Sequence, residues 1–389
     1  MRPTIDAGIK SLYLSRMQQD DLEIFLVTVP GLEGALFSEA KENGFKNPEL
    51  EKGGVTIRGS WQEVWRANLV MRGASHVLVR LGNFRAVHLA KLDKHARKFP
   101  WADTLRPDVP VRVEVTCRKS RIYHHKAAAE RFENAIKEEF GATIDKDSDV
   151  CIKVRILDDK CTVSVDTSGE PLHKRGHKEA VNKAPMRENI AALLLKECGY
   201  KGTEPIMDPM CGSGTFVIEA AEIAAGLLPG RTRSFAFEKL ATFNTEKWQK
   251  LKTVSEPKTP STQFFGFDRD AGAVKMSTAN AERAGVESFT NFDKNSISNI
   301  AVPDGLAGLV IINPPYGVRI GEIKKLTSLY QSIGRTLRAN FAGWRVGIAT
   351  NSDQLAKATG LRFTKKTTSF SHGGIHVKLY KTTPLPKNL

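Results

Sequence analysis

The chain has 389 residues, of which 41% are hydrophobic and 26% charged, so it can bury the cores of two or three domains and is not globally disordered. No stretch approaches the roughly 18–20 apolar residues of a membrane helix, and the first residues lack the apolar core of a secretory signal, so we expect a soluble, cytoplasmic protein without a membrane partner. The net charge of +15 favours a nucleic-acid partner, because basic side chains displace the counterions of phosphates.

The cysteine pattern gives a further exclusion. The five cysteines are scattered and none forms a C-x-x-C pair, so a structural zinc site is not expected. An odd, dispersed set also suits a reducing compartment better than a disulfide framework. We therefore expect no metal.

Short strand-like and helix-like runs alternate from residue 22 to residue 166. Strands are predicted at residues 22–29, 53–59, 76–81 and 109–117, helices at 31–44, 61–69, 87–99 and 127–140, and a hairpin around residues 158–160. In the last of these helices, Phe132, Ile136 and Phe140 recur at a spacing of four, which is the mark of an amphipathic helix. These runs indicate a small α+β module.

Residues 172–187 form a polar, basic stretch between two differently patterned regions. They carry five lysines or arginines and two histidines against one acidic residue. We interpret this stretch as an exposed linker.

The pattern changes to βαβ units from residue 188 onward. Strands are predicted at residues 204–209, 263–268, 308–313 and 344–350, and helices at 188–199, 214–228 and 271–285. A further helix presents one apolar face made of Leu326, Leu329, Tyr330, Ile333, Leu337 and Phe341. The chain closes with two strands joined at Gly373–Gly374. Alternating strands and helices predict a doubly wound parallel sheet, and the final hairpin gives it an antiparallel edge.

A glycine-rich loop, Asp208-Pro209-Met210-Cys211-Gly212-Ser213-Gly214-Thr215-Phe216, follows the first strand of this region. Glycines there let the backbone adopt positive φ and approach a ligand at the carboxyl end of the strand. The G-x-G-x-x-G fingerprint of dinucleotide folds and the Gly-Lys-Ser/Thr of a Walker loop are both absent. The form D-x-x-x-G-x-G resembles motif I of class I methyltransferases, and the alternative is a tight turn without a ligand.

Two more positions complete the expected cofactor site. The second strand ends at Asp268, which can accept both ribose hydroxyls, while Asp270 fits better as the cap of the next helix. The wide gap between Gly214 and Asp268 indicates an insertion of helix and loop at residues 229–254. The acidic residue that commonly contacts adenine is replaced by Ser296.

Asn313-Pro314-Pro315-Tyr316 follows the apolar strand that ends at residue 312, so it should share an edge of the sheet with the glycine loop. This tetrad resembles motif IV of amino-group methyltransferases, and the alternative is a rigid turn with a buried tyrosine. The Asn313 side chain and the Pro314 carbonyl can accept the two hydrogens of an exocyclic amine and stabilise the charge that develops on nitrogen. The prolines fix the loop, and Tyr316 can stack on a base.

With these residues in hand, the chain resembles the THUMP-containing RNA guanine-N2 methyltransferases, above all the bacterial 23S ribosomal RNA type. Residues 166–177, DTSGEPLHKRGH, look like a family segment in which His177 replaces an aromatic residue, and residues 184–188, APMRE, look like another. The resemblance implies S-adenosylmethionine as cofactor. It also implies structured RNA as substrate, 23S ribosomal RNA or a large-subunit assembly intermediate. The open alternatives are N2-guanine methylation of transfer RNA, a DNA amino-methyltransferase and a non-catalytic RNA-binding factor.

The resemblance also assigns domains and site residues. It implies a ferredoxin-like part at residues 1–60, a THUMP RNA-binding domain at 61–168, the basic linker at 169–187 and the methyltransferase domain at 188–389. The catalytic residues are expected to be Asn313, Pro314, Pro315 and Tyr316. The cofactor-binding residues are expected to be Asp208, Cys211, Gly212, Ser213, Gly214, Thr215, Phe216, Asp268, Arg269, Ser296 and Asn313. We expect Cys211 to fill space in the loop, although a thiol there also suggests a covalent mechanism.

RNA affinity is expected from the THUMP region. Basic residues gather at residues 106–137, where the alternative interpretation is a merely solvated surface. The candidate RNA contacts are Arg118, Lys119, Arg121, Lys126, Lys174 and Arg175. A fragment lacking everything up to Val181 should accordingly bind the cofactor but lose activity on structured RNA.

Overall fold

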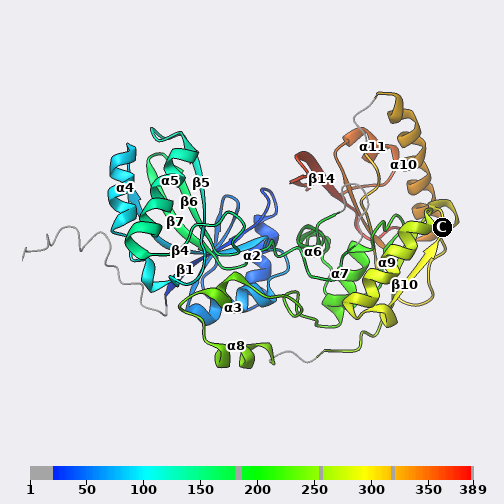
Figure 1. Ribbon diagram of the computed structural model, residues 1–389. Helices are drawn as coiled ribbons and strands as arrows, with labels where there is room; N and C mark the ends of the chain where they lie inside the picture. The colour runs from blue at the N-terminus through cyan, green and yellow to red at the C-terminus, as the bar shows by residue number, and fades with distance from the viewer. Residues whose placement is uncertain (1–20, 180–185, 254–256, 317–319, 387–389) are drawn as a thin grey trace, which may run out of the picture. The chain divides into compact units, whose positions relative to one another are not determined.

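The computed structural model describes residues 21–179, 186–253, 257–316 and 320–386, which form two compact units (Figure 1). Unit 1 consists of residues up to 27, 40–172 and 233–254. Unit 2 consists of residues 28–39, 173–232 and 255 onward. Helix α2 (Glu33–Glu42) therefore contributes residues to both.

Unit 1 is built on one continuous sheet. Its order is β2 (Glu49–Glu51), β3 (Gly54–Gly59), β1 (Leu22–Val27), β4 (His76–Arg85), β7 (Lys160–Asp166), β6 (Cys151–Leu157), β5 (Arg112–Arg118). Its pairs are antiparallel except β5 with β6. The predicted strands and the 151–166 hairpin are confirmed. Strand β2 was not predicted, because its three residues are too few to show a period in the sequence.

Helices cover one face of this sheet. They are α3 (Trp61–Val70), α4 (Leu89–Arg97) and α5 (His125–Ala135), with α4 and α5 lying side by side (Figure 1). Alternate residues of the strands are buried under them, as the pattern of β1 shows, where Leu22, Ile24 and Leu26 are fully covered. The predicted 127–140 helix is α5 followed by a π-helical turn at Ile136–Phe140, which ends at Gly141 with φ of +84°. The opposite face of the sheet carries no helix among the described residues.

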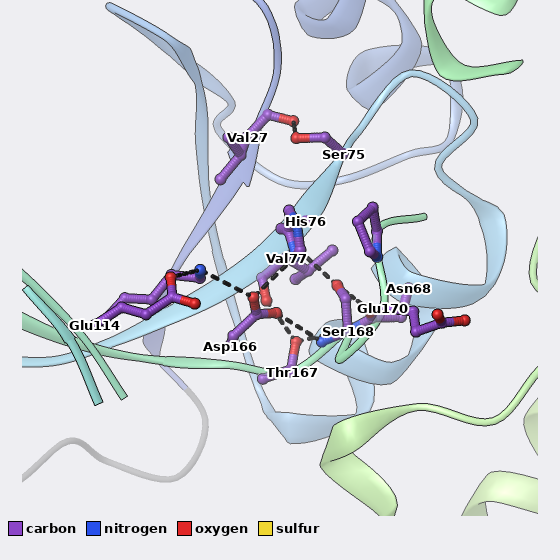
Figure 2. Close-up of polar contacts among 12 residues, drawn as sticks. Val27, Asn68, Ser75, His76, Val77, Glu114, Asp166, Thr167, Ser168 and Glu170 are labelled. Atoms are coloured by element: carbon purple, nitrogen blue, oxygen red, sulfur yellow. Dashed lines mark hydrogen bonds and ion pairs between the residues drawn. The ribbon is translucent and has the colours of Figure 1, made fainter. Parts of the chain in front are cut away.

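A buried polar network lies where β4 meets β7 (Figure 2). Asn68 of α3 donates to Thr167 Oγ1 at 2.9 Å and accepts from Ser168 Oγ at 2.7 Å. The same two hydroxyls bond the backbone of Val77: Thr167 donates to its carbonyl and Ser168 accepts from its amide. Beside them Asp166 lies 2.8 Å from His76. The segment after β7 is thereby tied to β4 and α3.

The insertion predicted at residues 229–254 folds mainly with unit 1. It contains a short 3₁₀ helix (Ala236–Lys239) and α8 (Thr245–Lys252). Phe237 stacks on Trp65 of α3, with ring centroids 6.0 Å apart, and meets Trp248 edge-on at 5.0 Å. Its backbone amide also donates to the Thr167 carbonyl. The aromatic residues of the insertion thus belong to the core of unit 1.

Unit 2 is a doubly wound sheet with an antiparallel edge, as predicted. Its order is β10 (Thr290–Lys294), β9 (Phe264–Asp268), β8 (Ile206–Asp208), β11 (Leu309–Ile312), β12 (Arg345–Thr350), β14 (Ile375–Lys381), β13 (Thr368–His372). The first five strands are parallel, and β14 runs antiparallel to both β12 and β13. Every residue of β11 is buried, in agreement with its expected central place.

The helices of unit 2 are α6 (Glu188–Glu197), α7 (Thr215–Ala224), α9 (Ala271–Ala284), α10 (Ile320–Asn340) and α11 (Asp353–Ala358). The apolar face predicted for α10 packs into a core cluster with β11 and β12, where Tyr330, Ile333 and Leu337 are fully buried. Among the described residues, no helix is both long and apolar enough to cross a membrane.

Candidate functional site

The glycine loop and the Asn-Pro-Pro-Tyr tetrad lie at the same edge of the unit 2 sheet. Strands β8 and β11 are parallel neighbours, with Leu309 opposite Ile206 and Val310 opposite Met207. Asp208 ends β8, and Asn313 directly follows β11. The predicted juxtaposition of these segments is confirmed at the level of the strands, since carboxyl ends of parallel neighbours share one edge.

The glycine loop is held by backbone contacts. Cys211 donates its amide to the Phe267 carbonyl at 2.9 Å, and Gly212 donates its amide to Asp268 Oδ2 at 3.0 Å. Gly212 and Gly214 have φ of +55° and +80°, which side chains rarely tolerate. A Cβ at Gly214 would crowd Ser277 and Phe292 at 3.1–3.2 Å, whereas one at Gly212 would meet nothing within 4 Å. The loop is therefore packed from behind and open at Gly212, as a backbone cradle for a ligand requires.

Asp208 is a buried carboxyl at the end of β8. It is 2% exposed and its Oδ1 accepts from the Met210 amide at 3.0 Å. Burial raises the pKa of Asp208 to about 8, and the nearby charge of Asp268 adds to the shift. A carboxyl held in this way suits a cationic group, because an ammonium beside it would stabilise the ionised form.

Asp268 and Asp270 make different contacts after β9. Asp270 caps α9 by accepting from the Gly272 amide at 2.9 Å, which confirms the predicted helix cap. Asp268 is only partly buried and bonds the backbone amides of Gly212 and Asp270, both at 3.0 Å. Its predicted role as ribose acceptor stays a prediction, as does that of the exposed Arg269.

The third strand end carries the position expected at adenine. Ser296 follows β10, and its amide donates to Asn295 Oδ1 at 2.9 Å. Its hydroxyl lies 3.0 Å from that of Ser298. The Asn295 amide in turn donates to the Asp268 carbonyl. Ser296 thus lies near the ribose candidate, and its contact with adenine stays a prediction.

The tetrad presents a free acceptor. The Asn313 Oδ1 atom is buried, and no described residue hydrogen-bonds it. Pro314 is buried and Pro315 exposed, so the loop turns outward after the first proline. Tyr316 packs partly against the core cluster around Tyr330, and burial raises its pKa. A buried amide oxygen without a partner, after the strand that neighbours β8, is free to accept a hydrogen bond from an amine.

The remaining loop residues face the protein. The Cys211 thiol is buried 3.6 Å from Ser277 Oγ, and burial raises its pKa, so it is a poor thiolate nucleophile. This favours the space-filling interpretation. Ser213, Thr215 and Phe216 are also buried, and their expected contacts with the cofactor stay predictions.

The basic stretch before α6 differs from its prediction as an exposed linker. Arg175 is 2% exposed and lies 3.5 Å from Glu219 of α7, while the buried His177 lies 3.9 Å from Glu222. Lys178 donates to Thr215 Oγ1 at 2.9 Å and lies 3.2 Å from Glu188. The cause is the acidic side chains of α6 and α7, which are buried and require cationic partners. Residues 180–185 lie outside the described part.

The candidate RNA contacts divide by exposure. Arg118, Lys119, Arg121, Lys126 and Lys174 are exposed, so they are available to a ligand. Arg175 is not, and its proposed contact with RNA is replaced by its ion pair with Glu219. No group of His, Cys, Asp and Glu side chains among the described residues is arranged to hold a metal ion.

Lys178 is the main functional candidate that the sequence motifs did not give. It also donates to the Met186 carbonyl at 2.8 Å, so it joins the segment before α6 to the first residue of α7. The available signal was the presence of acids in otherwise apolar helices, Glu188 in α6 and Glu219 and Glu222 in α7, of which Glu188 pairs with Lys178. Such acids are rarely buried without a partner, and the preceding basic stretch was the nearest source of one.

Comparisons with known proteins agree with this architecture. Residues 175–380 match the family profile described as RMKL-like methyltransferase domain, residues 23–78 the RlmL ferredoxin-like domain, and residues 86–166 the THUMP domain. The chain belongs to this family of THUMP-containing methyltransferases. The predicted class of S-adenosylmethionine-dependent methyltransferase, and with it the cofactor, is confirmed at the level of the family. The domain limits drawn from the sequence stay predictions.

The family includes curated proteins named ribosomal RNA large subunit methyltransferase K/L. The chain is 33% identical to the one from Psychromonas ingrahamii over 380 residues, which is 93% of this chain and 50% of the relative. It is 32% identical to the one from Vibrio campbellii over 355 residues, 87% of this chain and again 50% of the relative. The chain thus spans about half the length of the curated relatives it matches.

Solved structures show the same fold along nearly the whole chain. A possible methylase from Clostridium difficile has a TM-score of 0.83 at 26% identity, covering 95% of this chain and 99% of the other. A protein described as a predicted N6-adenine-specific DNA methylase, from Listeria monocytogenes, has a TM-score of 0.85 at 27% identity, covering 95% and 98%.

Proposed function

We propose that this protein transfers a methyl group from S-adenosylmethionine to the exocyclic N2 amine of a guanosine in structured RNA, with 23S ribosomal RNA as the substrate. The observation that carries the proposal is the buried, unpartnered Asn313 Oδ1 at the end of β11, beside the glycine loop at the end of β8. The names of the curated relatives support the RNA class, and such a substrate would place the activity in the cytoplasm.

The chain's own residues account for amine activation. The bound cofactor supplies a methyl group on a positively charged sulfur. Asn313 Oδ1 and the Pro314 carbonyl each accept one hydrogen of the amine, which turns the nitrogen lone pair out of the plane of the base. As the nitrogen–methyl bond forms, positive charge develops on nitrogen and both oxygens stabilise it; one such preorganised dipole contributes about 3–4 kcal/mol in favourable cases. The methylated nitrogen then releases one proton to water. The buried Pro314 restricts the backbone that positions these oxygens.

The residues around the glycine loop fit the cofactor. The backbone is open at Gly212, and Asp208 offers a buried carboxyl for an ammonium. Asp268 accepts a hydrogen bond from the Gly212 amide of the same loop. We assign Asp208 to the amino-acid end of the cofactor and Asp268 to its ribose.

A second candidate is methylation of the adenine N6 amine in DNA. A structure that resembles this chain along nearly its whole length is described in that way, and the Asn313 and Pro314 acceptors suit either amine. The THUMP domain favours RNA.

Transfer of a radiolabelled methyl group tests both candidates. The purified protein is incubated with transcribed 23S ribosomal RNA, transfer RNA or DNA, and the nucleic acid is digested for mass spectrometry. We expect N2-methylguanosine from 23S ribosomal RNA alone. Label in transfer RNA would redirect the substrate, N6-methyladenine in DNA would support the second candidate, and no transfer by protein that binds S-adenosylhomocysteine would contradict both.

A further inference from the structure

Helix α9 packs against the glycine loop with two polar side chains that no sequence motif singled out. It lies beside α7, which begins where the loop ends (Figure 1). The buried face of α9 consists of Ala273, Ser277, Asn280, Ala281 and Ala284. Ser277 and Asn280 are both 0% exposed, and their spacing of three places them on one side of the helix. Buried polar side chains are costly unless they are hydrogen-bonded, so the partners of these two indicate what they do.

Ser277 contacts the loop at Gly212. Its Oγ atom lies 2.9 Å from the Gly212 carbonyl oxygen, to which it donates, and 2.7 Å from the Ala273 carbonyl of its own helix. The same oxygen lies 3.6 Å from the Cys211 thiol. A Cβ at Gly214 would come within 3.1 Å of the Ser277 Cβ, so the helix and the loop are in direct contact. A larger side chain at this position would push the loop away from the helix.

Asn280 contacts the next residue of the loop. Its Nδ2 atom donates to the Ser213 carbonyl at 3.0 Å. Arg283 lies one turn further along α9, donates to Asn280 Oδ1 and also donates through Nε to the His177 carbonyl at 2.7 Å. Because a guanidinium has donors only, Arg283 fixes the amide with its oxygen toward the guanidinium and its nitrogen toward the loop. Two consecutive carbonyls of the loop are thus bonded by side chains of one helix.

Gly212 is held at both of its backbone groups and is open at its Cα. Its amide donates to Asp268 Oδ2, and its carbonyl accepts from Ser277. A Cβ added at Gly212 would meet nothing within 4 Å. Asp268 ends β9, and Ser277 belongs to the helix that follows. The strand and helix that carry the ribose candidate therefore also fix the glycine loop.

We propose that Ser277 and Asn280 are positioning residues, which hold the glycine loop in the conformation that receives the amino-acid end of S-adenosylmethionine. The inference rests on the proposed function, which assigns that end of the cofactor to Asp208. Ribose hydroxyls that share Asp268 with the Gly212 amide weaken the bond of that amide. The two bonds from α9 then keep the loop in place, and they do not compete with the ligand because both side chains are fully buried.

The conformation of the loop explains why it needs this support. Gly212 and Gly214 have φ of +55° and +80°. Glycine loses more conformational freedom on ordering than any other residue, so an unanchored loop would lose this freedom each time a ligand binds. Bonds that order the loop beforehand remove this entropic cost from the binding step and so increase the affinity.

Two ligands that differ at one end test the proposal. S-adenosylhomocysteine carries the amino-acid end, whereas 5′-methylthioadenosine keeps the adenosine and the sulfur and lacks the amino acid. Each is titrated by calorimetry into the wild type, Ser277→Ala and Asn280→Ala, at concentrations that saturate the wild type. We expect each variant to bind S-adenosylhomocysteine roughly three- to tenfold more weakly, which is the contribution of one hydrogen bond. The affinity for methylthioadenosine should stay that of the wild type.

Two control variants remove comparable hydrogen bonds elsewhere. Thr278→Val deletes a hydroxyl of the same helix, which bonds the Val274 carbonyl at 3.1 Å. Asn68→Ala deletes a buried amide of unit 1, which bonds the Val64 carbonyl and the Thr167 hydroxyl. Both controls should bind the two ligands with the wild-type ratio of affinities. Partial unfolding removes the same fraction of sites for both ligands, so this ratio reports the position of the loop and not the stability of the fold.

Failure of the positioning role and failure of the proposed function give different results. If Ser277→Ala and Asn280→Ala bind both ligands like the wild type, or weaken both equally, these residues support the fold and do not position the loop. A selective loss in one variant alone overturns the role of the other residue. A selective loss for methylthioadenosine would assign the loop to the adenosine end. If the wild type binds neither ligand, the proposed function fails as well.

Discussion

Asn313 offers a sharp test of chemistry at a single side chain. Its Oδ1 is buried without a described partner, so removing it should not disturb the fold. We expect Asn313→Ala to lower the rate of methyl transfer about a hundredfold or more, because a preorganised acceptor of the developing charge is lost. Affinity for S-adenosylhomocysteine, measured by titration calorimetry, should change little. Loss of that affinity in a folded variant would assign Asn313 to the cofactor instead.

Asp208 should couple stability to pH. Its carboxyl has an ordinary pKa near 3.8 in the unfolded chain and one of about 8 in the fold. Its stabilising contribution is therefore complete below pH 4 and is lost as pH rises toward 8, since the unfolded chain releases a proton that the fold retains. The side chain of the Asp208→Asn variant does not titrate. The free energy of unfolding of this variant, relative to the wild type, should therefore rise by a few kcal/mol between pH 4 and pH 8. We expect the variant to bind S-adenosylhomocysteine poorly.

Urea unfolding at several pH values, with and without the ligand, measures both effects. Asp270→Asn is a matched control, since Asp270 is an exposed helix cap at the same edge of the sheet. A stability difference between Asp208→Asn and the wild type that does not grow with pH would mean that Asp208 is ionised in the fold.

Individual motif residues were predictable because backbone constraints leave a signature in the sequence. Positive φ at Gly212 and Gly214, and the helix cap at Asp270, each require particular residue types. The partners of Arg175 and Lys178 were not predictable in this way. Any acid can satisfy a lysine, and the one that does is decided by tertiary packing.

At the scale of elements, the segment that precedes α6 supports the end of the glycine loop. Lys178 bonds Thr215, the first residue of α7, and also the Met186 carbonyl. We expect Lys178→Met to weaken S-adenosylhomocysteine binding about tenfold and to destabilise the fold by about 3 kcal/mol, because buried Glu188 loses its cation. The exposed neighbour Lys174→Met is the control.

Two readouts separate positioning from general stability. Ligand affinity is measured well below the unfolding temperature, so that both variants are fully folded. If Lys178→Met binds the ligand like the wild type despite a lower unfolding temperature, the lysine is structural and does not position the loop. Lys178→Arg should restore part of the affinity in the positioning case.

Elements with a strong period were predictable, and their partners were less so. The apolar run of β11 predicted a buried strand, and the apolar stripe of α10 predicted a helix packed on one face. The helix α8 was expected only as part of an insertion. No local signal predicted that Phe237 and Trp248 would join Trp65 in the core of unit 1. The sequence around an aromatic residue in a loop does not indicate which surface it packs against.

At the scale of the whole molecule, the chain passes between the units several times. The insertion carries the chain from unit 2 into unit 1 and back, and the segment from His173 onward belongs to unit 2. A cut at Val181 therefore does not follow a boundary of either unit. It exposes Phe237 and Trp248, which are buried in the intact chain, and it removes Arg175 and Lys178 from α7.

These crossings change what a truncated protein should do. The fragment from Asn182 onward was expected from the sequence to bind the cofactor, and we now expect it to aggregate, since exposed aromatic surface and unpaired buried acids both destabilise it. A fragment that begins at His173, with residues 233–254 replaced by a flexible glycine-serine linker, keeps the cations and omits the aromatic residues, although it lacks residues 28–39 of unit 2. It should bind S-adenosylhomocysteine with the affinity of the full chain and methylate structured RNA far more slowly. Equal behaviour of the two fragments in calorimetry and light scattering would show that neither the insertion nor residues 173–181 matter to the folding of unit 2.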